Sequence, residues 1–413
     1  MQEFQENKEQ DFYGLGIAPG LLDVLKQAGF TKPTPIQVRT IPLGIQGKDL
    51  VGIAQTGTGK TLAFGIPMIQ LLLSQKKQGL VILPTRELAL QVEVAFKKIG
   101  QKQGLRTAML IGGLPFGAQR RDIFRKPHII IGTPGRINDH LTQKTLSLSN
   151  VSMVVLDEAD RMFDMGFLPQ IKTILKAIPR ERQTMLFSAT MPPEIMRLAK
   201  DYMKTPLRVE VTPSGTTVEG VTQELFIVAR EQKSELLARL LKKYTGPTLV
   251  FTRTKHGAKK VARQIRDLNI RSSEIHSNKS LSQRREALDG FKSGKYRVLV
   301  ATDIASRGID VTGIELVLNY DLPGTSEDYV HRIGRTARAG NKGYAITFAM
   351  VTEGKEVRAI ERVIQKRLPT TPLPEGIVAP RMEASVVRSP RPHPRGRGRS
   401  GPRQRHTGFG RKR

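Results

Sequence analysis

Three carboxylates stand close together in the segment VSMVVLDEAD, residues 151–160. Asp157, Glu158 and Asp160 follow residues 153–156, an apolar run rich in β-branched side chains that is typical of a buried strand. Burying carboxylates is costly unless a cation pairs with them, and a divalent metal on a nucleotide would do so. This interpretation has Asp157 hold Mg²⁺ through its water shell and Glu158 polarise an attacking water. The alternative is an acidic helix N-terminus, which the helix dipole favours.

A glycine-rich loop, AQTGTGKT, occupies residues 54–61 and follows a predicted strand at 49–53. Gly57 and Gly59 would let the loop curl until its backbone N–H groups surround phosphate. Lys60 would reach the β- and γ-phosphates, and Thr61 would offer its hydroxyl to Mg²⁺. Ala54 stands where the strict pattern G-x-x-x-x-G-K-[ST] has glycine. With a strand before it and a helix after it, the loop predicts a nucleoside triphosphate site.

The segment HRIGRTARAG, residues 331–340, repeats basic side chains at helical spacing. His331, Arg335 and Arg338 fall at i, i+4 and i+7, which predicts one face of a helix. Such arginines often make surface ion pairs. In a chain with a triphosphate loop, however, they predict arginine fingers that neutralise charge developing on the γ-phosphate. The loop of ATDIASRGID, 301–310, is expected to face the same cleft.

A proline-rich turn, TKPTPIQ, precedes another predicted helix. Pro33 and Pro35 fix an extended backbone, so Gln37 is presented at a defined place. A glutamine amide can pair with the N6 and N7 edge of adenine, and Phe12 could stack on the same base. The alternative is a solvated helix start.

The elements that position these residues alternate between strands and helices, which predicts parallel sheets covered by helices on both faces. Small polar residues at 211–220 predict a linker between two such units. The second unit has no phosphate loop, so we expect it to close over a nucleotide held by the first. The predicted strands are 49–53, 80–83, 107–111, 128–131, 153–156 and 184–187, then 223–228, 247–251, 297–301, 314–318 and 344–348.

The chain of 413 residues carries a net charge of +30. This charge favours a polyanionic partner, nucleic acid before an anionic membrane. Residues 381–413 alone hold eleven Lys or Arg against one Glu. We expect this Pro-, Arg- and Gly-rich tail to be disordered and to contact phosphates irrespective of base sequence. A tail that only improves solubility is the alternative.

Other classes of protein are disfavoured by what the sequence lacks. No apolar run approaches the roughly 18 residues that span a bilayer, and the N-terminal segment MQEFQENKEQ resembles neither a secretory signal nor a transit peptide. There is no cysteine for disulfides, thiol nucleophiles or zinc ligands, and no H-x-x-x-H pair. These features predict a cytoplasmic protein, which we expect to be a monomer, that meets nucleic acid and not membrane.

The ordered set of motifs resembles the DEAD-box family of ATP-dependent RNA helicases over roughly residues 12–350. This resemblance implies an α/β fold of two tandem RecA-like domains, ATP and Mg²⁺ in a cleft, and single-stranded RNA across both domains. The motifs are Phe12 with GFTKPTPIQ, AQTGTGKT, PTRELA, Gly112-Gly113, TPGR, DEAD, SAT, LVFTRT, ATDIASRGID and HRIGRTAR.

The family's roles transfer to matching positions of this sequence. Catalysis is implied for Glu158 as base, with Lys60, Asp157, Arg335 and Arg338; metal binding for Thr61 and Asp157. Nucleotide binding is implied for Phe12, Lys32, Gln37, Ala54, Gln55, Thr56, Gly57, Thr58, Gly59, Lys60, Thr61 and, at the ribose, Asp310. RNA backbone contact is implied for Pro84, Thr85, Arg86, Gly113, Thr133, Gly135, Arg136, Arg253, Thr302 and Arg307. Coupling of the two sites is implied for Asp160, Ser188, Thr190 and His331.

The expected domains are 12–210 for ATP binding, a linker at 211–220, a helicase domain at 221–368 and the tail at 369–413. Two positions depart from the family pattern. Leu281 stands where the family has Gln three residues before Arg284, so one RNA contact is in doubt, although Gln283 is adjacent. Ala337 replaces the more usual Gly, a change expected to favour the helix.

Two other functions fit parts of the sequence. A DNA translocase of a related helicase group would share the nucleotide loop but accept deoxyribose in the gripped strand. A non-catalytic RNA chaperone would act through the basic tail, and its annealing activity would survive loss of Lys60. The leading hypothesis is an RNA-dependent ATPase that unwinds short duplexes or remodels RNA–protein complexes.

Overall fold

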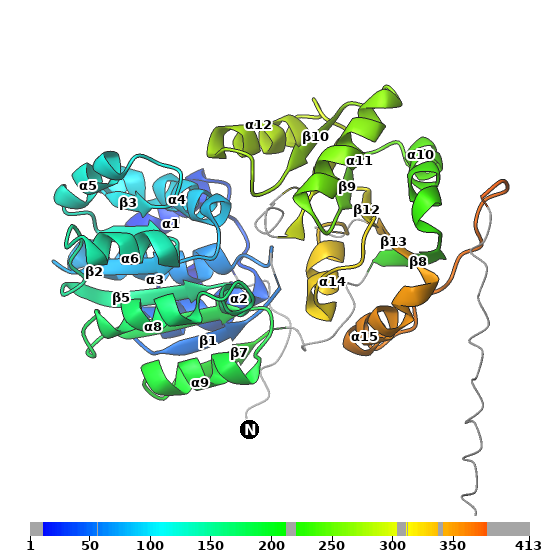
Figure 1. The fold of residues 1–413 in the computed structure, drawn as a ribbon. Coiled ribbons are helices and arrows are strands. Elements are labelled where there is room, and N and C mark those ends of the chain that lie inside the picture. Colours follow the sequence, from blue (N-terminus) through cyan, green and yellow to red (C-terminus); the bar gives the residue numbers. More distant parts are fainter. Residues whose placement is uncertain are drawn as a thin grey trace, which may run out of the picture. The chain divides into compact units, whose positions relative to one another are not determined.

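The computed structural model describes residues 11–55, 57–211, 220–303, 311, 313–337 and 342–377. Two parallel sheets organise these residues, and Figure 1 shows helices on both faces of each. The first sheet has the strand order β3-β4-β2-β5-β6-β1-β7 and the second β10-β11-β9-β12-β13-β8. Within the described residues no helix is long and apolar enough to cross a membrane. The predicted α/β fold with two sheets is confirmed.

The first sheet contains every strand predicted for it and one more. Its strands are β1 (Leu50–Ile53), β2 (Gln78–Ile82), β3 (Thr107–Leu110), β4 (Ile129–Gly132), β5 (Val151–Asp157), β6 (Gln183–Ser188) and β7 (Leu207–Glu210). Its helices are α1 (Pro19–Gln27), α2 (Pro35–Ile45), α3 (Lys60–Ser74), α4 (Arg86–Gly100), α5 (Phe116–Phe124), α6 (Pro134–Thr142), α7 (Ala159–Asp164), α8 (Leu168–Lys176) and α9 (Pro193–Tyr202). The additional strand, β7, is a short edge strand with a mostly exposed surface, so it lacks an apolar run.

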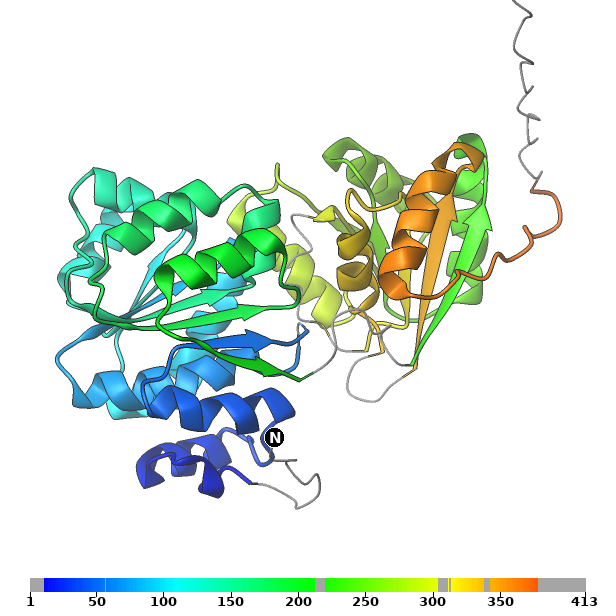
Figure 2. The ribbon, with the colours of Figure 1, turned by 90° about the horizontal axis from the view of Figure 1, so that it is seen from below.

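Successive strand residues of the first sheet point to opposite faces and build two separate cores. Val81 and Val155 belong to the core that includes helices α1 to α4. Leu80 and Val154 belong to the core that includes α6 to α9. In Figure 2 the blue helices near the N-terminus and the green helices near residue 200 accordingly lie on opposite faces of this sheet. A strand that is apolar on both faces reads as a continuous hydrophobic run, which explains why these strands were predictable.

The second sheet repeats this construction. Its strands are β8 (Val221–Ile227), β9 (Thr248–Phe251), β10 (Ser272–Ile275), β11 (Val298–Ala301), β12 (Leu316–Asn319) and β13 (Gly343–Ala349). Its helices are α10 (Lys233–Lys243), α11 (Lys255–Asp267), α12 (Leu281–Lys292), α14 (Ser326–Ile333) and α15 (Gly354–Ile364). Strand β10 was not predicted, because its sequence SSEI carries two serines and a glutamate on the edge of the sheet.

The segment after α15 corrects the predicted start of the tail. The backbone N–H of Leu225 in β8 donates to the Pro369 carbonyl at 2.9 Å, and Thr371 donates back to Leu225 at 2.8 Å. Ile377 is buried in the core beneath α10 and α11. A disordered tail beginning at residue 369 is therefore wrong for 369–377, because apolar side chains beyond the last helix still pack on the second sheet. Residues 378–413 lie outside the described part of the chain.

Candidate functional site

The candidate site lies along the carboxyl ends of the strands of the first sheet, which we call the carboxyl edge. Because all its strands are parallel, their carboxyl ends meet at that edge, where open α/β sheets bind ligands. Residues predicted to bind nucleotide follow β1, at 54–61, and those predicted to hold metal, to catalyse or to couple the two sites lie at the ends of β5 and β6, at 157–160 and 188–190. Residues predicted to contact RNA follow β2, β3 and β4, at 84–86, 113 and 133–136. Each set thus occupies one half of the edge, and the halves adjoin between β2 and β5.

The glycine-rich loop has the backbone conformation that its sequence predicts. Gly57 and Gly59 both have φ of 90°, a region that favours glycine, and helix α3 begins directly afterwards at Lys60. Lys60 is buried, and its Nζ donates to the Ala54 carbonyl 3.1 Å away. The helix N-terminus and a buried ammonium together form a site that attracts phosphate. Thr56 lies outside the described residues.

Gln37 lies against this loop. Its Nε2 donates to the Gly59 carbonyl at 2.9 Å, and its Oε1 accepts from the Thr34 backbone N–H at 3.0 Å. A Cβ added at Gly59 would collide with the Gln37 amide, so the loop glycine allows this close approach. Phe12 is buried in the hydrophobic core on this face of the sheet, and Lys32 is exposed. The proline turn therefore brings Gln37 to the phosphate loop.

Asp157 ends strand β5 and Glu158 begins the turn into α7. Glu158 has φ of 53°, a strained conformation for a side chain other than glycine and one that concentrates at functional sites. Its carboxylate lies 2.6 Å from the Arg161 guanidinium, and both side chains are buried. The turn thus holds two carboxylates together in a place that excludes water.

The pKa values of these two carboxyl groups are shifted in opposite directions. Burial raises the pKa of Asp157 to about 6, partly offset by the Lys60 charge. Burial also acts to raise the pKa of Glu158, but the charges of Arg161 and Lys60 outweigh it and lower that pKa overall. Glu158 is therefore ionised over the physiological range. Such separation of two neighbouring carboxylates is the pattern by which proteins assign them different roles.

Asp160 connects the DEAD turn to the end of β6. Its backbone N–H donates to Ser188 Oγ at 3.1 Å. Its Oδ2 accepts from the Thr190 backbone N–H at 2.9 Å, from Thr190 Oγ1 at 3.0 Å and from the Ala189 N–H at 3.1 Å. The sequence segments DEAD and SAT are thus joined by one carboxylate.

The RNA half of the edge centres on Arg86. A Cβ at Gly112 or Gly113 would collide with its guanidinium, and Gly113 has φ of 84°, so both glycines leave room for this side chain. Burial, and then the charge of Arg284, lower the pKa of Arg86. Thr85 caps helix α4 by accepting from the Leu88 N–H at 3.3 Å. This packing fixes a cation beside the strand ends.

Three further residues of the RNA half follow β4. Arg136 Nη1 donates to the Leu114 carbonyl at 3.1 Å, and its guanidinium also lies over the Phe116 ring. Thr133 is the N-cap of α6, and a Cβ at Gly135 would meet open space. Pro84 follows β2 and is buried. An open helix N-terminus beside Arg86 and Arg136 provides donors for a phosphate backbone.

In the second sheet, two predicted RNA contacts also follow neighbouring strands. Arg253 comes after β9, exposes about half of its side chain and lies 3.8 Å from Glu353. Thr302 comes after β11, and its N–H donates to the Ile275 carbonyl at 3.3 Å. Arg307 and Asp310 lie outside the described residues.

The predicted helical face at 331–338 is wrong. Helix α14 ends at Ile333, so Arg335 lies in a turn and its Nε donates to the His331 carbonyl at 3.2 Å. Ala337 has φ of 52°, in the left-handed region, so the alanine does not favour a helix there. Glycine is the less strained choice at such a position, which gives a physical reason for its usual presence. Arg338 lies outside the described residues.

Arg335 is deeply buried, with only 3% of its surface exposed, and His331 is partly buried. Burial lowers the pKa of His331 to about 3, so its imidazole is neutral. A neutral imidazole carries one donor and one acceptor.

Two buried arginines were missed from the sequence. Arg161 holds Glu158, and Arg332 makes a bidentate pair with Asp303 at 2.6 and 2.8 Å. Arg332 also donates to Asn319 Oδ1 at 3.1 Å and to the Asp321 carbonyl at 2.7 Å. The i, i+3 spacing from Glu158 was a usable signal for Arg161. Nothing in the sequence distinguished Arg332 from the arginines predicted to act on phosphate.

The chain matches two family models. Residues 34–198 match the DEAD/DEAH box helicase model, and residues 232–340 match the helicase conserved C-terminal domain. The chain is 42% identical over 388 residues to the ATP-dependent rRNA helicase RRP3 of Debaryomyces hansenii, covering 93% of this chain and 81% of that protein. It is 44% identical over 361 residues to the DEAD-box ATP-dependent RNA helicase CshA of Bacillus cereus, covering 86% and 69% respectively.

Solved structures of other proteins have the same fold as this chain. Mss116p bound to single-stranded RNA and AMP-PNP matches with a TM-score of 0.82 at 27% identity, covering 91% of this chain and 82% of that one. Dbp5 of S. cerevisiae bound to RNA and ADP BeF3 matches with a TM-score of 0.79 at 29% identity, covering 87% and 95%. The two sheets are therefore tandem RecA-like domains.

Proposed function

This chain belongs to the DEAD-box family of ATP-dependent RNA helicases, and from that premise we propose which residues carry the reaction. The observation that carries the proposal is that two different sets of residues follow the strands in the two halves of the first sheet. Phosphate-loop and carboxylate residues follow β1, β5 and β6, whereas basic and glycine residues follow β2, β3 and β4. One rigid sheet thus holds an ATP site and an RNA site side by side.

In the ATP half, Lys60 and the loop 54–61 bind the phosphates and Gln37 selects adenine. Glu158 is the general base that polarises the attacking water. Its ion pair with Arg161 supports this role, because the carboxylate is kept ionised and oriented while buried. Arg335 and Arg338 supply positive charge to the γ-phosphate, and Asp310 binds the ribose.

Asp157 and Thr61 are the residues that would hold Mg²⁺. No three His, Cys, Asp or Glu side chains group as a metal site within the described residues. This supports a metal held mainly by nucleotide phosphates, with one carboxylate, one hydroxyl and retained waters from the protein side. The ion would supply neutralisation of phosphate charge. The raised pKa of buried Asp157 also fits, because a cation would remove the cost of its ionisation.

In the RNA half, Arg86, Arg136 and the backbone around Gly113 and Gly135 grip the phosphates of a single strand. The basic charge of the chain supports backbone recognition without base reading. Arg253, Thr302 and Arg307 of the second domain grip the same strand. Mss116p and Dbp5 were solved with RNA bound, which makes single-stranded RNA the first ligand to test here.

Coupling runs through Asp160, Ser188, Thr190 and His331. ATP and RNA together close the two domains, hydrolysis reopens them, and the bent strand melts a short duplex locally. We place the domains at 12–210 and 221–377, joined by 211–220; the second domain extends past the expected limit of 368 because residues 369–377 pack on its sheet. The end of β7 at Glu210 and the start of β8 at Val221 support these limits. We further infer a cytoplasmic monomer, to be tested by light scattering and cell fractionation.

The decisive experiment is steady-state ATP hydrolysis with no nucleic acid, with single-stranded RNA and with DNA of the same sequence. Strong stimulation by RNA alone is expected. Equal stimulation by DNA would favour a translocase, and annealing activity without stimulation would favour an RNA chaperone. Because relatives in yeasts are rRNA helicases, structured rRNA fragments are the first duplex substrates to try.

The base assignment has its own test. Glu158→Gln keeps the size of the side chain and is expected to bind ATP and RNA but to accumulate in the closed, RNA-bound state. Its ATP turnover should fall by about 10²-fold or more, the usual contribution of a general base. Normal turnover in this variant would remove Glu158 from the mechanism. Glu181→Gln, on an exposed side chain of the same domain, is the matched control.

A further inference from the structure

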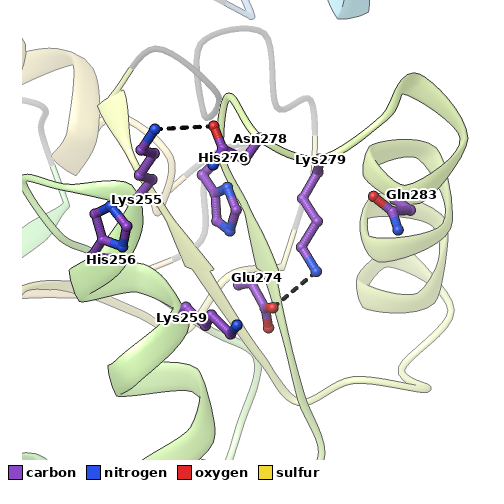
Figure 3. Close-up of a pocket in the computed structure, with 8 residues that line it drawn as sticks. All are labelled: Lys255, His256, Lys259, Glu274, His276, Asn278, Lys279 and Gln283. Atoms are coloured by element: carbon purple, nitrogen blue, oxygen red, sulfur yellow. Dashed lines mark hydrogen bonds and ion pairs between the residues drawn. The ribbon is translucent and has the colours of Figure 1, made fainter.

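A cavity in the C-terminal domain is lined by residues that the proposed ATP site does not use. It is a cavity of about 320 Å³ at the carboxyl end of β10, lined by the first turns of α11 and by residues leading into α12. Figure 3 shows its side chains converging from these three elements. Basic residues predominate: Lys255, His256 and Lys259 on α11, and Lys279 after β10. We call this cavity the β10 pocket.

The polar group that most needs a ligand in the β10 pocket is the imidazole of His276. This side chain is 6% exposed, and neither Nδ1 nor Nε2 has a hydrogen-bond partner in the described residues. Burying an unpaired donor and acceptor is costly, and native proteins rarely leave both unsatisfied. Burial, and then the charge of Lys279, lower the pKa of His276, so its ring presents one donor and one acceptor. A ligand with anionic oxygens would satisfy the donor.

The cations around His276 are only partly neutralised. Lys279 lies 2.9 Å from Glu274, but Glu274 also pairs with Arg266 at 3.1 Å, so its single charge is shared. Lys255 donates to the neutral Asn278 amide oxygen at 3.2 Å. The β10 pocket therefore keeps net positive charge, and the N-terminus of the 13-residue helix α11 adds to it.

Lys259 has no hydrogen bond or ion pair within the described residues and lines the same cavity as His276; Figure 3 shows its ammonium on the side of Glu274. An ammonium with three donors and an imidazole with one can share the oxygens of one anionic group. A phosphate group at the end of a chain offers three free oxygens to these donors, whereas an internal phosphodiester offers only two.

We propose that the β10 pocket binds a phosphate monoester, supplied either by the terminal phosphate of an RNA strand or by free phosphate. Its location fits the first source. Strand β10 is the edge strand and pairs with β11, which pairs in turn with β9; β11 and β9 precede Thr302 and Arg253. The β10 pocket therefore lies at the same end of the sheet as these proposed RNA contacts, next to the outermost of them. Binding of the terminal phosphate of RNA depends on the proposed function, whereas binding of free phosphate does not.

The first arm of the test measures RNA affinity of the full chain by fluorescence anisotropy. Otherwise identical strands carry a 5′-phosphate, a 3′-phosphate or hydroxyls at both ends. We expect one phosphorylated strand to bind about tenfold more tightly than the hydroxyl strand, a difference of about 1.4 kcal/mol. Lys259→Gln and His276→Gln should each abolish that advantage. Lys292→Gln, on the exposed surface of α12, should keep it.

The second arm follows the histidine ring signals by NMR while inorganic phosphate is added, with chloride as the ionic-strength control. His276→Gln assigns the His276 signals. Saturable shifts are expected in the unaltered chain and in Lys292→Gln, but not in Lys259→Gln. These shifts without any preference for an RNA end would identify free phosphate as the ligand. They would persist even if RNA failed to stimulate ATP hydrolysis, so the two proposals can fail separately.

Two outcomes would overturn the proposal. In the first, neither arm shows a phosphate effect. In the second, Lys259→Gln weakens hydroxyl and phosphorylated strands equally and inorganic phosphate leaves the His276 signals in place. The pocket would then belong to a continuous groove for internal phosphates. Circular dichroism of both variants checks that the domain is folded.

Discussion

The Gln37 side chain donates a hydrogen bond to the carbonyl oxygen of Gly59, with 2.9 Å between Nε2 and the oxygen. Its other amide atom accepts from the Thr34 backbone and completes the capping box of α2. One buried side chain therefore joins the start of α2 to the phosphate loop. A substitution at Gln37 will therefore remove a contact of the phosphate loop even when no nucleotide is bound.

Replacing Gln37 by Glu should weaken ATP binding and reduce discrimination between ATP and GTP. The new carboxylate has no donor for Gly59, and its charge would face the carbonyl oxygen and the phosphates. Losing one buried hydrogen bond costs about 1–3 kcal/mol, so the KM for ATP should rise about tenfold or more. KM values for ATP and GTP, measured with saturating RNA, test this. Gln75→Glu, on an exposed residue after α3, should leave both unchanged.

The raised pKa of Asp157 predicts a pH-dependent stability of the chain without nucleotide. The folded state holds this proton up to about pH 6, because burial raises the pKa of the carboxyl from its usual 3.8. Between those values the folded state binds more protons than the unfolded state, so stability falls as pH rises. From about pH 5 to about pH 7.5 the Asp157 contribution should fall by about 1 kcal/mol.

Urea unfolding of the unaltered chain and of Asp157→Asn at several pH values tests this. The asparagine does not titrate, so the difference in unfolding free energy between the two proteins should change in the variant's favour as pH rises. Asp201→Asn, on an exposed residue of α9, should show no such trend. A pH-independent difference for Asp157→Asn would contradict the buried titration.

The central strands of both sheets could be predicted because they are apolar on both faces. Residues 129–131 are three consecutive isoleucines, and each is fully or almost fully buried. The edge strands β7 and β10 could not be predicted this way, since β7 is mostly exposed and β10, although largely buried, has the polar sequence SSEI. The strand order was equally inaccessible, because short parallel strands carry no pairing code that a single sequence displays.

The ligand-facing motifs were predictable because phosphate chemistry demands particular residues at fixed spacing. The partners that hold those residues were not. Arg161 and Arg332 contact Glu158 and Asp303, but buried and exposed arginines look alike in a sequence. Helical spacing also failed to predict the structure after Ile333. The end of α14 there depends on the backbone conformation of single residues, which a hydrophobic pattern does not reveal.

The left-handed backbone at Ala337 gives a stability prediction. Ala337→Gly removes the contact between Cβ and the backbone that costs about 1–2 kcal/mol at such a φ, although glycine also gains freedom in the unfolded chain. The net expectation is a gain of up to about 1 kcal/mol in unfolding free energy. Ala359→Gly, inside helix α15, should lose about 0.5–1 kcal/mol by the same measurement. Destabilisation by both substitutions would contradict the strain at Ala337.

The hydrogen bonds of the Asp160 carboxylate lead us to expect that one substitution, Thr190→Ala, affects ATP hydrolysis and duplex unwinding to different extents. Thr190→Ala removes one of the three hydrogen bonds that Asp160 Oδ2 accepts, while the N–H donors of residues 189 and 190 stay. The fold and the phosphate loop are untouched, so RNA-stimulated ATP hydrolysis should change less than about tenfold, because one hydrogen bond contributes roughly 0.5–1.5 kcal/mol.

Duplex unwinding per ATP hydrolysed should fall more steeply in that variant, because movement of the DEAD turn must pass through Asp160 to reach the end of β6. Thr190→Ser keeps the hydroxyl and should restore the ratio. Both rates are measured on the same short RNA duplex, with ATP hydrolysis followed in parallel. If Thr190→Ala lowers hydrolysis and unwinding by the same factor, the threonine supports the ATP site alone and the coupling must run by another route.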